Sequence, residues 1–373
     1  MRSDFKVVWR NEVDPWFVKG FSHGMLTLTG SEKDAQVHNT FSIIDVGPKQ
    51  ILREAFGKSG RPGTFGFIGG PPCPDFSVGG KNRGSRGEKG KLSEVYVKRI
   101  KELQPSFFVF ENVPGLLRTH KHRSFLLQLL RELDPSYVLD LKILNALDQG
   151  APQDRERVFI IGFARKWLRR EQGIRVPVDV NGAFLRTHSL ENSRQFTLPG
   201  LNGNCWFPWP RDERYNNAKR RFNWPKQVPF GTEPPKPTGI PDELMVQSYI
   251  CNLDEISRLP NGLEGFEPKS NKFSQIAEGD DSRKSFKRLH RWRYSPAAAY
   301  GNNEVHLHPQ KPRRLTVREA LRIQTVPDQY ALPSQMPLSS KFKTIGNGVP
   351  VKLSTAIASS VFKVIKGDFN GNF

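Results

Sequence analysis

Residues 66–80 read G-F-I-G-G-P-P-C-P-D-F-S-V-G-G, a short apolar run that passes through glycines into a Pro-Cys-Pro turn. The run predicts a buried strand, and in open α/β sheets ligands bind just beyond the carboxyl ends of the strands. Cys73 lies at one such end. A lone cysteine is more often a small buried packing residue. Two flanking prolines, however, fix the backbone and present the thiol rigidly, which favours a nucleophile.

Outward from this stretch, residues 1–164 alternate between two kinds of pattern. Four other apolar runs, at residues 5–9, 41–46, 107–110 and 158–163, indicate buried strands. Apolar residues recur at helical spacing in segments 92–103 and 126–133. This alternation predicts an α/β fold with a doubly wound, mostly parallel sheet.

The composition limits the partners. The chain has 373 residues, and 57 lysines and arginines against 37 aspartates and glutamates give a formal net charge of +20. This excess implies a polyanionic partner, because each phosphate that is neutralised releases bound counterions. Three separate cysteines without a C-x-x-C pair argue against a disulfide framework or a cysteine zinc site. No apolar run approaches the ~20 residues of a membrane helix, so we expect no membrane partner and a cytoplasmic protein.

The pattern changes at residue 165, where periodicity weakens and prolines, glycines and aromatic residues beside basic ones accumulate. We predict a second, irregular β and loop domain over residues 165–344, and a first domain made of residues 1–164 plus 345–373. Thr316 and Glu319 form a capping-box pattern before a short helix. Residues 350–365 predict an amphipathic helix that begins at Pro350 and needs the first domain to cover its apolar face.

Two polar clusters accompany the other central strands. Residues 107–115 read F-F-V-F-E-N-V-P-G, so Glu111 ends an apolar strand where burial raises a carboxyl pKa and favours the protonated form. Capping of a neighbouring helix explains Glu111 equally well. Residues 153–157 read Q-D-R-E-R. If a strand begins there, Arg155 and Arg157 point to one face, where they suit a phosphate or a carboxylate such as Glu111. A surface ion pair is the plainer alternative.

The segment after Cys73 and a pair of histidines carry weaker signals. Residues 79–91 are rich in glycine, lysine and arginine, which suits either a solvated loop or a lid that closes on a polyanion. The segment does not match a phosphate loop, because Gly90-Lys91 is followed by Leu92 instead of serine or threonine.

His306 and His308 have a spacing that two metal ligands can share, but without a third ligand nearby we expect no metal site.

Together these segments resemble the cytosine-C5 DNA methyltransferase family, in the family's order and over most of the chain. P-P-C-P-D-F-S at 71–77 resembles the nucleophile motif, E-N-V at 111–113 the glutamate motif and Q-D-R-E-R at 153–157 the Q-x-R-x-R motif. R-R-L-T-V-R-E-A-L-R-I-Q-T-V-P-D at 313–328 and I-G-N-G-V-P at 345–350 are similar to its closing signatures. The variable region, residues 165–312, resembles the family's target-recognition region.

The resemblance implies the fold of S-adenosylmethionine-dependent methyltransferases and a specific chemistry. Cys73 would attack C6 of cytosine as a thiolate, which makes C5 nucleophilic toward the methyl group of S-adenosylmethionine. Glu111 would bind N3 and the exocyclic amine, and Arg155 would hold the glutamate and the base in register. Arg155 and Arg157 would also favour the thiolate. The target base would have to leave the DNA stack first.

The resemblance also assigns a cofactor pocket, with one departure from the family pattern. Glu12 resembles the acid that binds the ribose hydroxyls, and Asp45 resembles the acid that meets the adenine amine. The family's opening strand and F-x-G-x-G loop have no counterpart before Phe5. We therefore expect a start further upstream, with a separate completing peptide or a defective copy as the alternatives. Further positions that match the pocket lining are Pro72, Leu92, Asn347 and Val349.

For the substrate, the resemblance implies double-stranded DNA of a specific sequence, a monomeric enzyme and a cognate restriction endonuclease as functional partner. Ser77 and the basic loop would contact the DNA, while basic residues of the variable region would enter the major groove or grip phosphates. A DNA-binding protein without catalysis and a tRNA-directed family member are the alternatives. The candidate DNA contacts are Ser77, Lys81, Arg83, Arg86, Lys284, Arg288 and Arg291.

Overall fold

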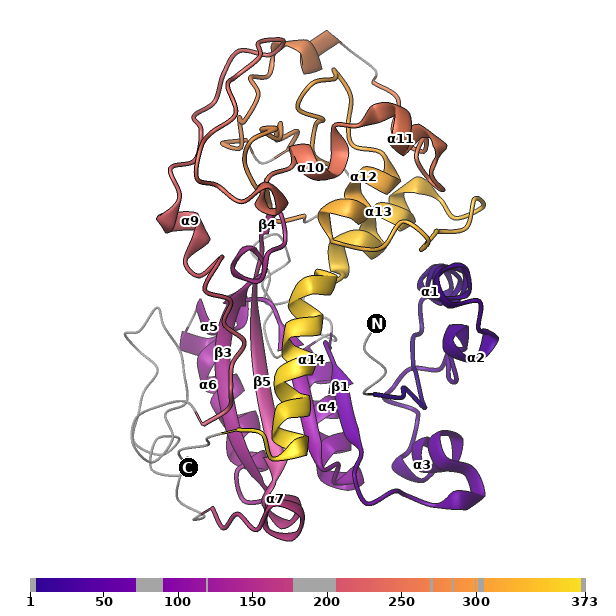
Figure 1. Ribbon diagram of the computed structural model, residues 1–373. Helices are drawn as coiled ribbons and strands as arrows, with labels where there is room; N and C mark the ends of the chain where they lie inside the picture. The colour runs from indigo at the N-terminus through magenta and orange to yellow at the C-terminus, as the bar shows by residue number, and fades with distance from the viewer. Residues whose placement is uncertain are drawn as a thin grey trace.

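The computed structural model describes residues 5–71, 90–118, 120–176, 206–268, 271–283, 285–298, 300 and 305–369. A four-stranded sheet with strand order β1-β2-β5-β3 forms one part, and a loop-rich lobe lies above it in Figure 1. The strands are β1 Gly66–Gly69, β2 Phe107–Asn112, β3 Tyr137–Asn145, β4 Gln153–Asp154, β5 Glu156–Ala164 and β6 Ser295–Pro296. The helices are α1 Pro15–Thr29, α2 Glu32–Ala35, α3 Pro48–Phe56, α4 Gly90–Leu103, α5 Gly115–Arg118, α6 His120–Leu133, α7 Arg165–Gln172, α9 Ala218–Arg221, α10 Gln247–Ile250, α11 Leu253–Arg258, α12 Val317–Ile323, α13 Leu338–Asn347 and α14 Val351–Lys366. Short 3-10 turns are η1 Gly57–Ser59, η3 Leu147–Gln149, η4 Asp242–Leu244 and η5 Asn271–Gln275.

The main sheet is mixed. β1 pairs with β2 in parallel, with Gly66 opposite Phe107, whereas β5 runs antiparallel to both β2 and β3. The reversal follows from the connection, because residues 146–155 between β3 and β5 are too few for the crossover of a dozen or more residues that a parallel neighbour needs. The predicted α/β class is confirmed, but the described sheet is mixed rather than doubly wound and mostly parallel.

Helices cover both faces of this sheet. Side chains alternate along β2, so that Phe108 and Phe110 pack against α4 and α6 on one face. Phe107 and Val109 lie on the other face, in one cluster with α7, α14 and the buried Trp206. Both predicted helices, 92–103 and 126–133, are confirmed as α4 and α6. The apolar stripe of α14 is covered by the sheet, as its sequence pattern predicts.

Two predicted strands are wrong. Within the described chain, residues 5–9 and 41–46 form no strand, and the nearby pairing is an isolated bridge between Asn11 and Asn39. Val7 and Ile44 of these segments are 55% and 51% exposed, whereas Val46 is buried in a small cluster with Ile51 and Leu103. β1 is the outer strand of the described sheet, and its Ile68 is 68% exposed.

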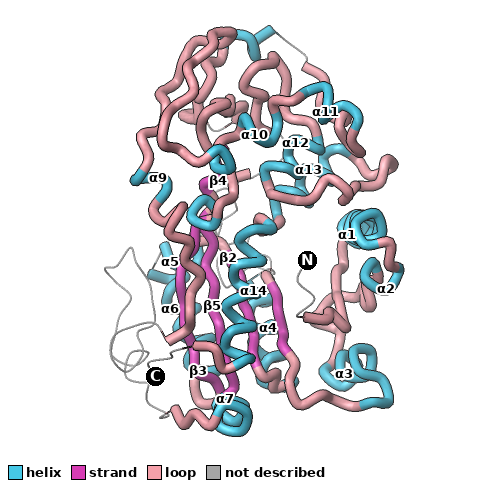
Figure 2. Tube along the Cα trace, viewed as in Figure 1, coloured by secondary structure: helices cyan, strands magenta, loops and turns pink. Residues whose placement is uncertain are grey.

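The upper lobe consists mostly of loops with short helices (Figure 2). Its described strand is β6, which pairs with β4, so the described part of the predicted irregular β and loop region is mostly loop. Thr316 caps α12 with both hydrogen bonds of the predicted capping box. Residues 165–172 and Trp206, which we assigned to the second domain, pack on the sheet. The boundaries 165 and 345 themselves stay predictions.

One stretch, Leu338–Lys366, is long and apolar enough by composition to cross a membrane, with a mean hydropathy of 1.3 over an 18-residue window. Gly348 and Pro350 interrupt it between α13 and α14. Leu353, Ile357 and Val361 pack into the sheet cluster. Core packing therefore accounts for the apolar character of this stretch.

Candidate active site

The carboxyl ends of the parallel strands β1 and β2 lie side by side, and polar groups from both strands are in contact there. A Cβ added to Gly70, directly after β1, would lie 2.6 Å from Glu111 Oε2, so a larger residue there would displace the carboxylate. Asn112 Nδ2 donates to the carbonyl oxygen of Pro71 at 3.4 Å. Pro72 and Cys73 follow next and lie outside the described residues. The chain that carries Cys73 therefore leaves the sheet beside Glu111.

Glu111 forms an ion pair with Arg157 across β2 and β5. Arg157 Nε lies 2.9 Å from Glu111 Oε1, and the side chains are 12% and 20% exposed. Burial raises the pKa of Glu111, while the charges of Arg157 and Arg155 act in the opposite direction. Among the contacts of the described chain, none joins Glu111 to a helix N-terminus, so the ion pair rather than helix capping explains its position.

Arg155 differs from its prediction. Its Nη1 donates to Ala298 O at 2.8 Å and its Nη2 to Gly346 O at 2.6 Å, and the residue is 1% exposed. The predicted direct grip of Arg155 on Glu111 was wrong, because Arg157 makes that contact. β4 ends at Asp154 and β5 begins at Glu156, so the alternation of side chains is broken at position 155. Burial, and secondarily the charge of Arg157, lower the pKa of Arg155 to about 9.

Gln153 is a buried residue whose side-chain contacts were not predicted from the sequence. Ala298 N donates to Gln153 Oε1 at 3.1 Å, while Gln153 Nε2 lies 3.4 Å from Gln324 Oε1. Gln153 and Arg155 thus bind the amide and the carbonyl of one residue, Ala298. Its position as the first residue of the Q-D-R-E-R motif was the sequence signal that could have singled out Gln153. This contact, with the β4–β6 pairing, joins the sheet to the loop-rich lobe.

The predicted cofactor residues lie on two neighbouring segments and at the end of α13. Glu12 N donates to Asn39 O at 3.2 Å, which places the Glu12 segment beside the one that leads to Asp45. Glu12 Oε1 accepts from Val13 N and Asp14 N, at 2.8 and 2.9 Å. Neither Glu12 nor Asp45 has an ion pair within the described residues. Leu92 and Val349 are half-buried and Asn347 is exposed.

These residues fit an adenosyl group in their chemistry. The free oxygen of Glu12 and the exposed carboxylate of Asp45 are acceptors for ribose hydroxyls and an amine. Val349 and the exposed Ile68 offer apolar surface for a ring. Contacts that would join all of these residues into one pocket are not present among the described residues.

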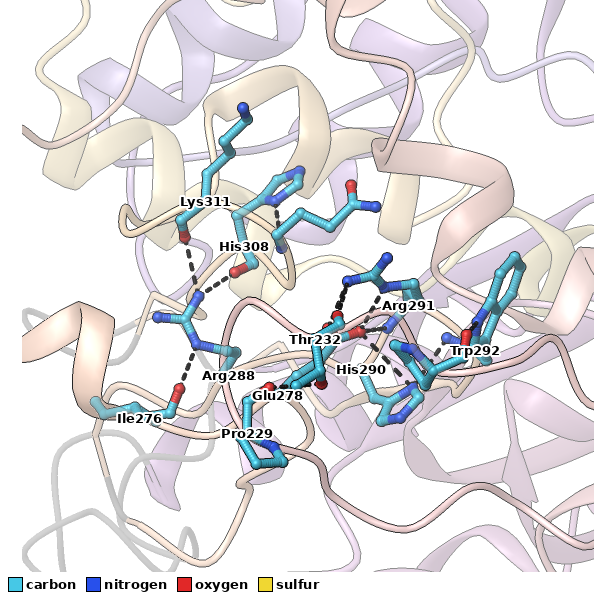
Figure 3. Close-up of polar contacts among 12 residues, drawn as sticks. Pro229, Thr232, Ile276, Glu278, Arg288, His290, Arg291, Trp292, His308 and Lys311 are labelled. Atoms are coloured by element: carbon cyan, nitrogen blue, oxygen red, sulfur yellow. Dashed lines mark hydrogen bonds and ion pairs between the residues drawn. The ribbon is translucent and has the colours of Figure 1, made fainter.

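Two of the predicted DNA contacts are wrong. Arg288 is fully buried, and its Nε and Nη1 donate to the carbonyl oxygens of Ile276 and Lys311, at 2.8 and 2.9 Å (Figure 3). Arg291 is 6% exposed and forms an ion pair with Glu278 at 2.9 Å. Their charge is used inside the lobe, so neither is open to a DNA phosphate. Ser77, Lys81, Arg83, Arg86 and Lys284 lie outside the described residues.

The two histidines that were weighed as metal ligands make internal hydrogen bonds. His308 Nε2 lies 3.1 Å from Ile250 O, and His306 Nδ1 lies 3.3 Å from Ser295 Oγ. Burial lowers the pKa of His306 to about 3 and that of His308 to about 4. Among the residues that the structure describes, no group of three or more metal-ligating side chains occurs.

Comparison with solved structures first defines the class by fold. A chain described as a DNA modification methyltransferase of an E. coli prophage superposes with a TM-score of 0.59 at 21% identity, covering 97% of this chain and 93% of that one. This likeness concerns the fold alone. A family model, C-5 cytosine-specific DNA methylase, matches residues 1–363. The chain belongs to the C-5 cytosine-specific DNA methylase family.

Curated relatives agree with this assignment. Type II methyltransferase M.NmeDI of Neisseria meningitidis serogroup C is 44% identical over 374 residues, which cover 98% of this chain and 80% of the relative. Type II methyltransferase M.MthTI of Methanothermobacter thermautotrophicus is 30% identical over 314 residues, 83% of this chain and 82% of that protein. The resemblance inferred from the motifs is therefore confirmed.

Proposed function

We propose that this chain transfers a methyl group from S-adenosylmethionine to C5 of cytosine within a specific sequence of double-stranded DNA. The half-buried Glu111–Arg157 pair at the carboxyl ends of β1 and β2 carries the proposal. Gly70 lies directly against the Glu111 carboxylate of this pair. Cys73 is three residues further along the chain, which can span at most about 11 Å. A thiol and a carboxyl group can thus act on one pyrimidine ring.

Glu111 acts on the target base as a hydrogen-bonding acid. Because burial raises its pKa, a protonated carboxyl can donate to N3 while its other oxygen accepts from the exocyclic amine. Arg157 holds Oε1 and so fixes the plane of the carboxyl group. Charge is then withdrawn from the ring while the Cys73 thiolate bonds to C6. C5 accepts the methyl group, and loss of the C5 proton lets the C6–S bond break and expels the thiolate.

Other residues bind and orient. S-adenosylmethionine supplies the electrophilic methyl group when bound; Glu12 would accept from its ribose hydroxyls and Asp45 from its adenine amine. Pro72, Leu92, Asn347 and Val349 are proposed to line the same pocket. Arg155 braces the site, because its hydrogen bond to Gly346 O holds the residue next to Asn347. Ser77, Lys81, Arg83, Arg86 and Lys284 are proposed to contact the DNA.

Names of the relatives support a biological setting. M.NmeDI and M.MthTI are Type II methyltransferases, a class whose name belongs to restriction-modification systems. We propose that this chain protects DNA from a cognate restriction endonuclease in the bacterial cytoplasm and acts as a monomer. Bisulfite sequencing of host DNA, with and without expression of the chain, would identify the modified cytosine and its sequence.

A methyl-transfer assay tests the catalytic assignment. With duplex DNA and labelled cofactor we expect 5-methylcytosine, and with 5-fluorocytosine DNA we expect a covalent complex. Cys73→Ser should abolish both products, and Glu111→Gln should slow methylation without loss of DNA binding. The exposed Arg169→Ala on α7 serves as a surface control and should retain activity. Methylation by Cys73→Ser would remove Cys73 from its role.

A second candidate, sequence-specific DNA binding without catalysis, is favoured by one observation. β1 is the outer strand of the described sheet, and large apolar side chains beside the proposed cofactor residues are exposed, 68% for Phe41 and for Ile68. Such a surface is consistent with an incomplete cofactor site. This candidate predicts specific retention of duplex DNA, no incorporation of label, and no saturable S-adenosylmethionine binding in equilibrium dialysis.

A further inference from the structure

In addition to the segment that holds Arg288 and Arg291, the loop-rich lobe contains a second basic segment, residues 211–226, which we call the α9 segment. Part of its charge is compensated: Arg211 pairs with Glu213 at 2.7 Å, and Arg214 with Asp212 at 2.8 Å. Lys219 pairs with Asp154 at 2.7 Å. Within the described chain, the remaining cations of the segment have no carboxylate partner, and they are all exposed: Arg220, Arg221 and Lys226.

Contacts with the catalytic part hold α9 in place. Lys219 binds Asp154 of β4, and Ala218 N donates to Asp148 Oδ1 at 3.0 Å. Ala218 itself is fully buried, in a cluster with Leu147 and Tyr215. Figure 1 places α9 beside β4, where the sheet meets the loop-rich lobe. The free cations are therefore fixed to the strand that leads into the active site rather than to a separate loop.

The anchor lies close to the reacting base. Asp154 precedes Arg157 by three residues, which an extended chain spans in about 10 Å. Each DNA strand carries one phosphate charge per ~3.4 Å of helix axis. Phosphates up to three steps from an extruded cytosine therefore lie within about 10 Å of it along the strand. Arg157 in turn contacts Glu111, the residue that addresses the base. A cation on α9 is therefore within reach of the backbone beside the target.

Arg221 is held ready for an anion. Its Nη1 donates to Glu213 O at 2.7 Å, and its guanidinium lies over the Phe222 ring, 5.3 Å from the centroid. Nε and Nη2 make no hydrogen bond within the described part of the chain. A planar donor fork that is already oriented loses little freedom when it binds phosphate. Arg220, with no partner among the described residues, adds a second charge next to it.

We propose that Arg220 and Arg221, with Lys226, form the surface that binds the DNA sugar-phosphate backbone beside the target cytosine. The proposal rests on the proposed function in naming DNA as the polyanion. These contacts add affinity that does not depend on sequence, because phosphates carry no base identity. The recognised bases must then be read by other residues.

Salt-dependent binding of a labelled duplex tests the proposal. Each phosphate contact contributes about 0.9 to the slope of log K against log salt concentration, so Arg220→Ala/Arg221→Ala should lower that slope by about 1.8. Across a fourfold range of salt, the variant should lose about tenfold less affinity than the unaltered chain. Cognate and unrelated duplexes should be affected alike, and kcat at saturating DNA should stay unchanged while KM for DNA rises.

Two controls separate the possible outcomes. Arg169→Ala removes one exposed charge from α7, at the far end of the sheet in Figure 1, and should leave the slope unchanged. Arg220→Lys/Arg221→Lys keeps both charges and should restore the slope. An unchanged slope in the alanine double variant, with methylation by the unaltered chain intact, would overturn the α9 proposal. Absence of methylation by the unaltered chain on every duplex would instead overturn the proposed function.

Discussion

Two basic segments of the loop-rich lobe carry similar charge and use it in opposite ways. In residues 288–291, which we call the inward segment, both arginines turn inward, with Arg288 on backbone carbonyls and Arg291 on Glu278. In the α9 segment, Arg220 and Lys226 stay exposed. A compensated guanidinium has no counterions to release, so it adds little to DNA affinity. A run of basic residues therefore locates a DNA surface only after its counter-charges have been found.

The largest expected effect concerns the inward segment. Glu278→Ala leaves Arg291 buried without its carboxylate, and removing one partner of a buried ion pair costs about 3–5 kcal/mol. We expect the free energy of unfolding in urea to fall by about that amount. Asp281→Ala is the matched control, because the Arg293–Asp281 pair is partly exposed and should contribute at most about 1 kcal/mol. Equal losses in both variants would contradict the contrast between the segments.

The two arginines of the Q-D-R-E-R motif also use their charge differently: Arg157 contacts the Glu111 carboxylate, whereas Arg155 contacts backbone carbonyls. Arg157→Ala removes the contact that fixes the plane of the Glu111 carboxyl group, so we expect a fall in kcat of about 100- to 1000-fold. The loss of stability should be limited, because the unpaired carboxyl can take up a proton. Arg155→Ala leaves the carbonyls of Ala298 and Gly346 without their donor, so the melting temperature should fall first. Melting curves beside kcat check this ordering, and the reverse ordering would refute it.

Acid should lower the free energy of unfolding through His290, which lies in the inward segment. Burial lowers the pKa of His290 to about 4, against about 6.5 in an unfolded chain. Between these values the unfolded chain binds more protons, so the free energy of unfolding falls as pH falls from about 6.5 toward 4. The contribution is up to about 1.4 kcal/mol per pH unit. Urea denaturation at pH 7 and pH 5 should show a difference that is about 2 kcal/mol smaller in His290→Gln than in the unaltered chain.

The smallest effect compares two exposed lysines. Lys226 has no carboxylate partner in the described chain, whereas Lys236 lies 2.7 Å from Asp242. Lys226→Ala should lower the salt slope of DNA binding by about 0.9, and Lys236→Ala should leave it nearly unchanged. Equal slopes for the two variants would show that compensation by a carboxylate does not decide which cations bind DNA.

The sequence located three of the four described strands of the main sheet and missed the fourth. Uniformly apolar runs identified β2 and β5, because strands buried on both faces need no polar residue, and a shorter apolar run identified the outer strand β1. β3 was missed because Asp140 and Lys142 interrupt its pattern, although Asp140 is fully buried and accepts from Phe207 N at 3.0 Å. Residues 5–9 and 41–46 have strand-like composition, but a strand also needs a neighbour, which local sequence does not show.

For the site, sequence order identified the motifs but not the contacts. Glu111 and Arg157 were predicted as neighbours, and the structure joins them. Arg155 was given the contact that Arg157 makes, because the break between β4 and β5 has no sequence signal. Arg288 and Arg291 were assigned to DNA from charge alone, and their buried partners, such as Glu278, are reached only through the tertiary fold.

The grip of Gln153 and Arg155 on Ala298 sets a limit for protein engineering. Because both polar groups of one peptide residue are held by the strand that leads into the active site, a transplanted recognition module must bring a matching backbone at positions 295–298. Chimeras joined outside that window should inherit a new target site together with turnover. Chimeras joined inside it should still bind their new target yet modify it poorly.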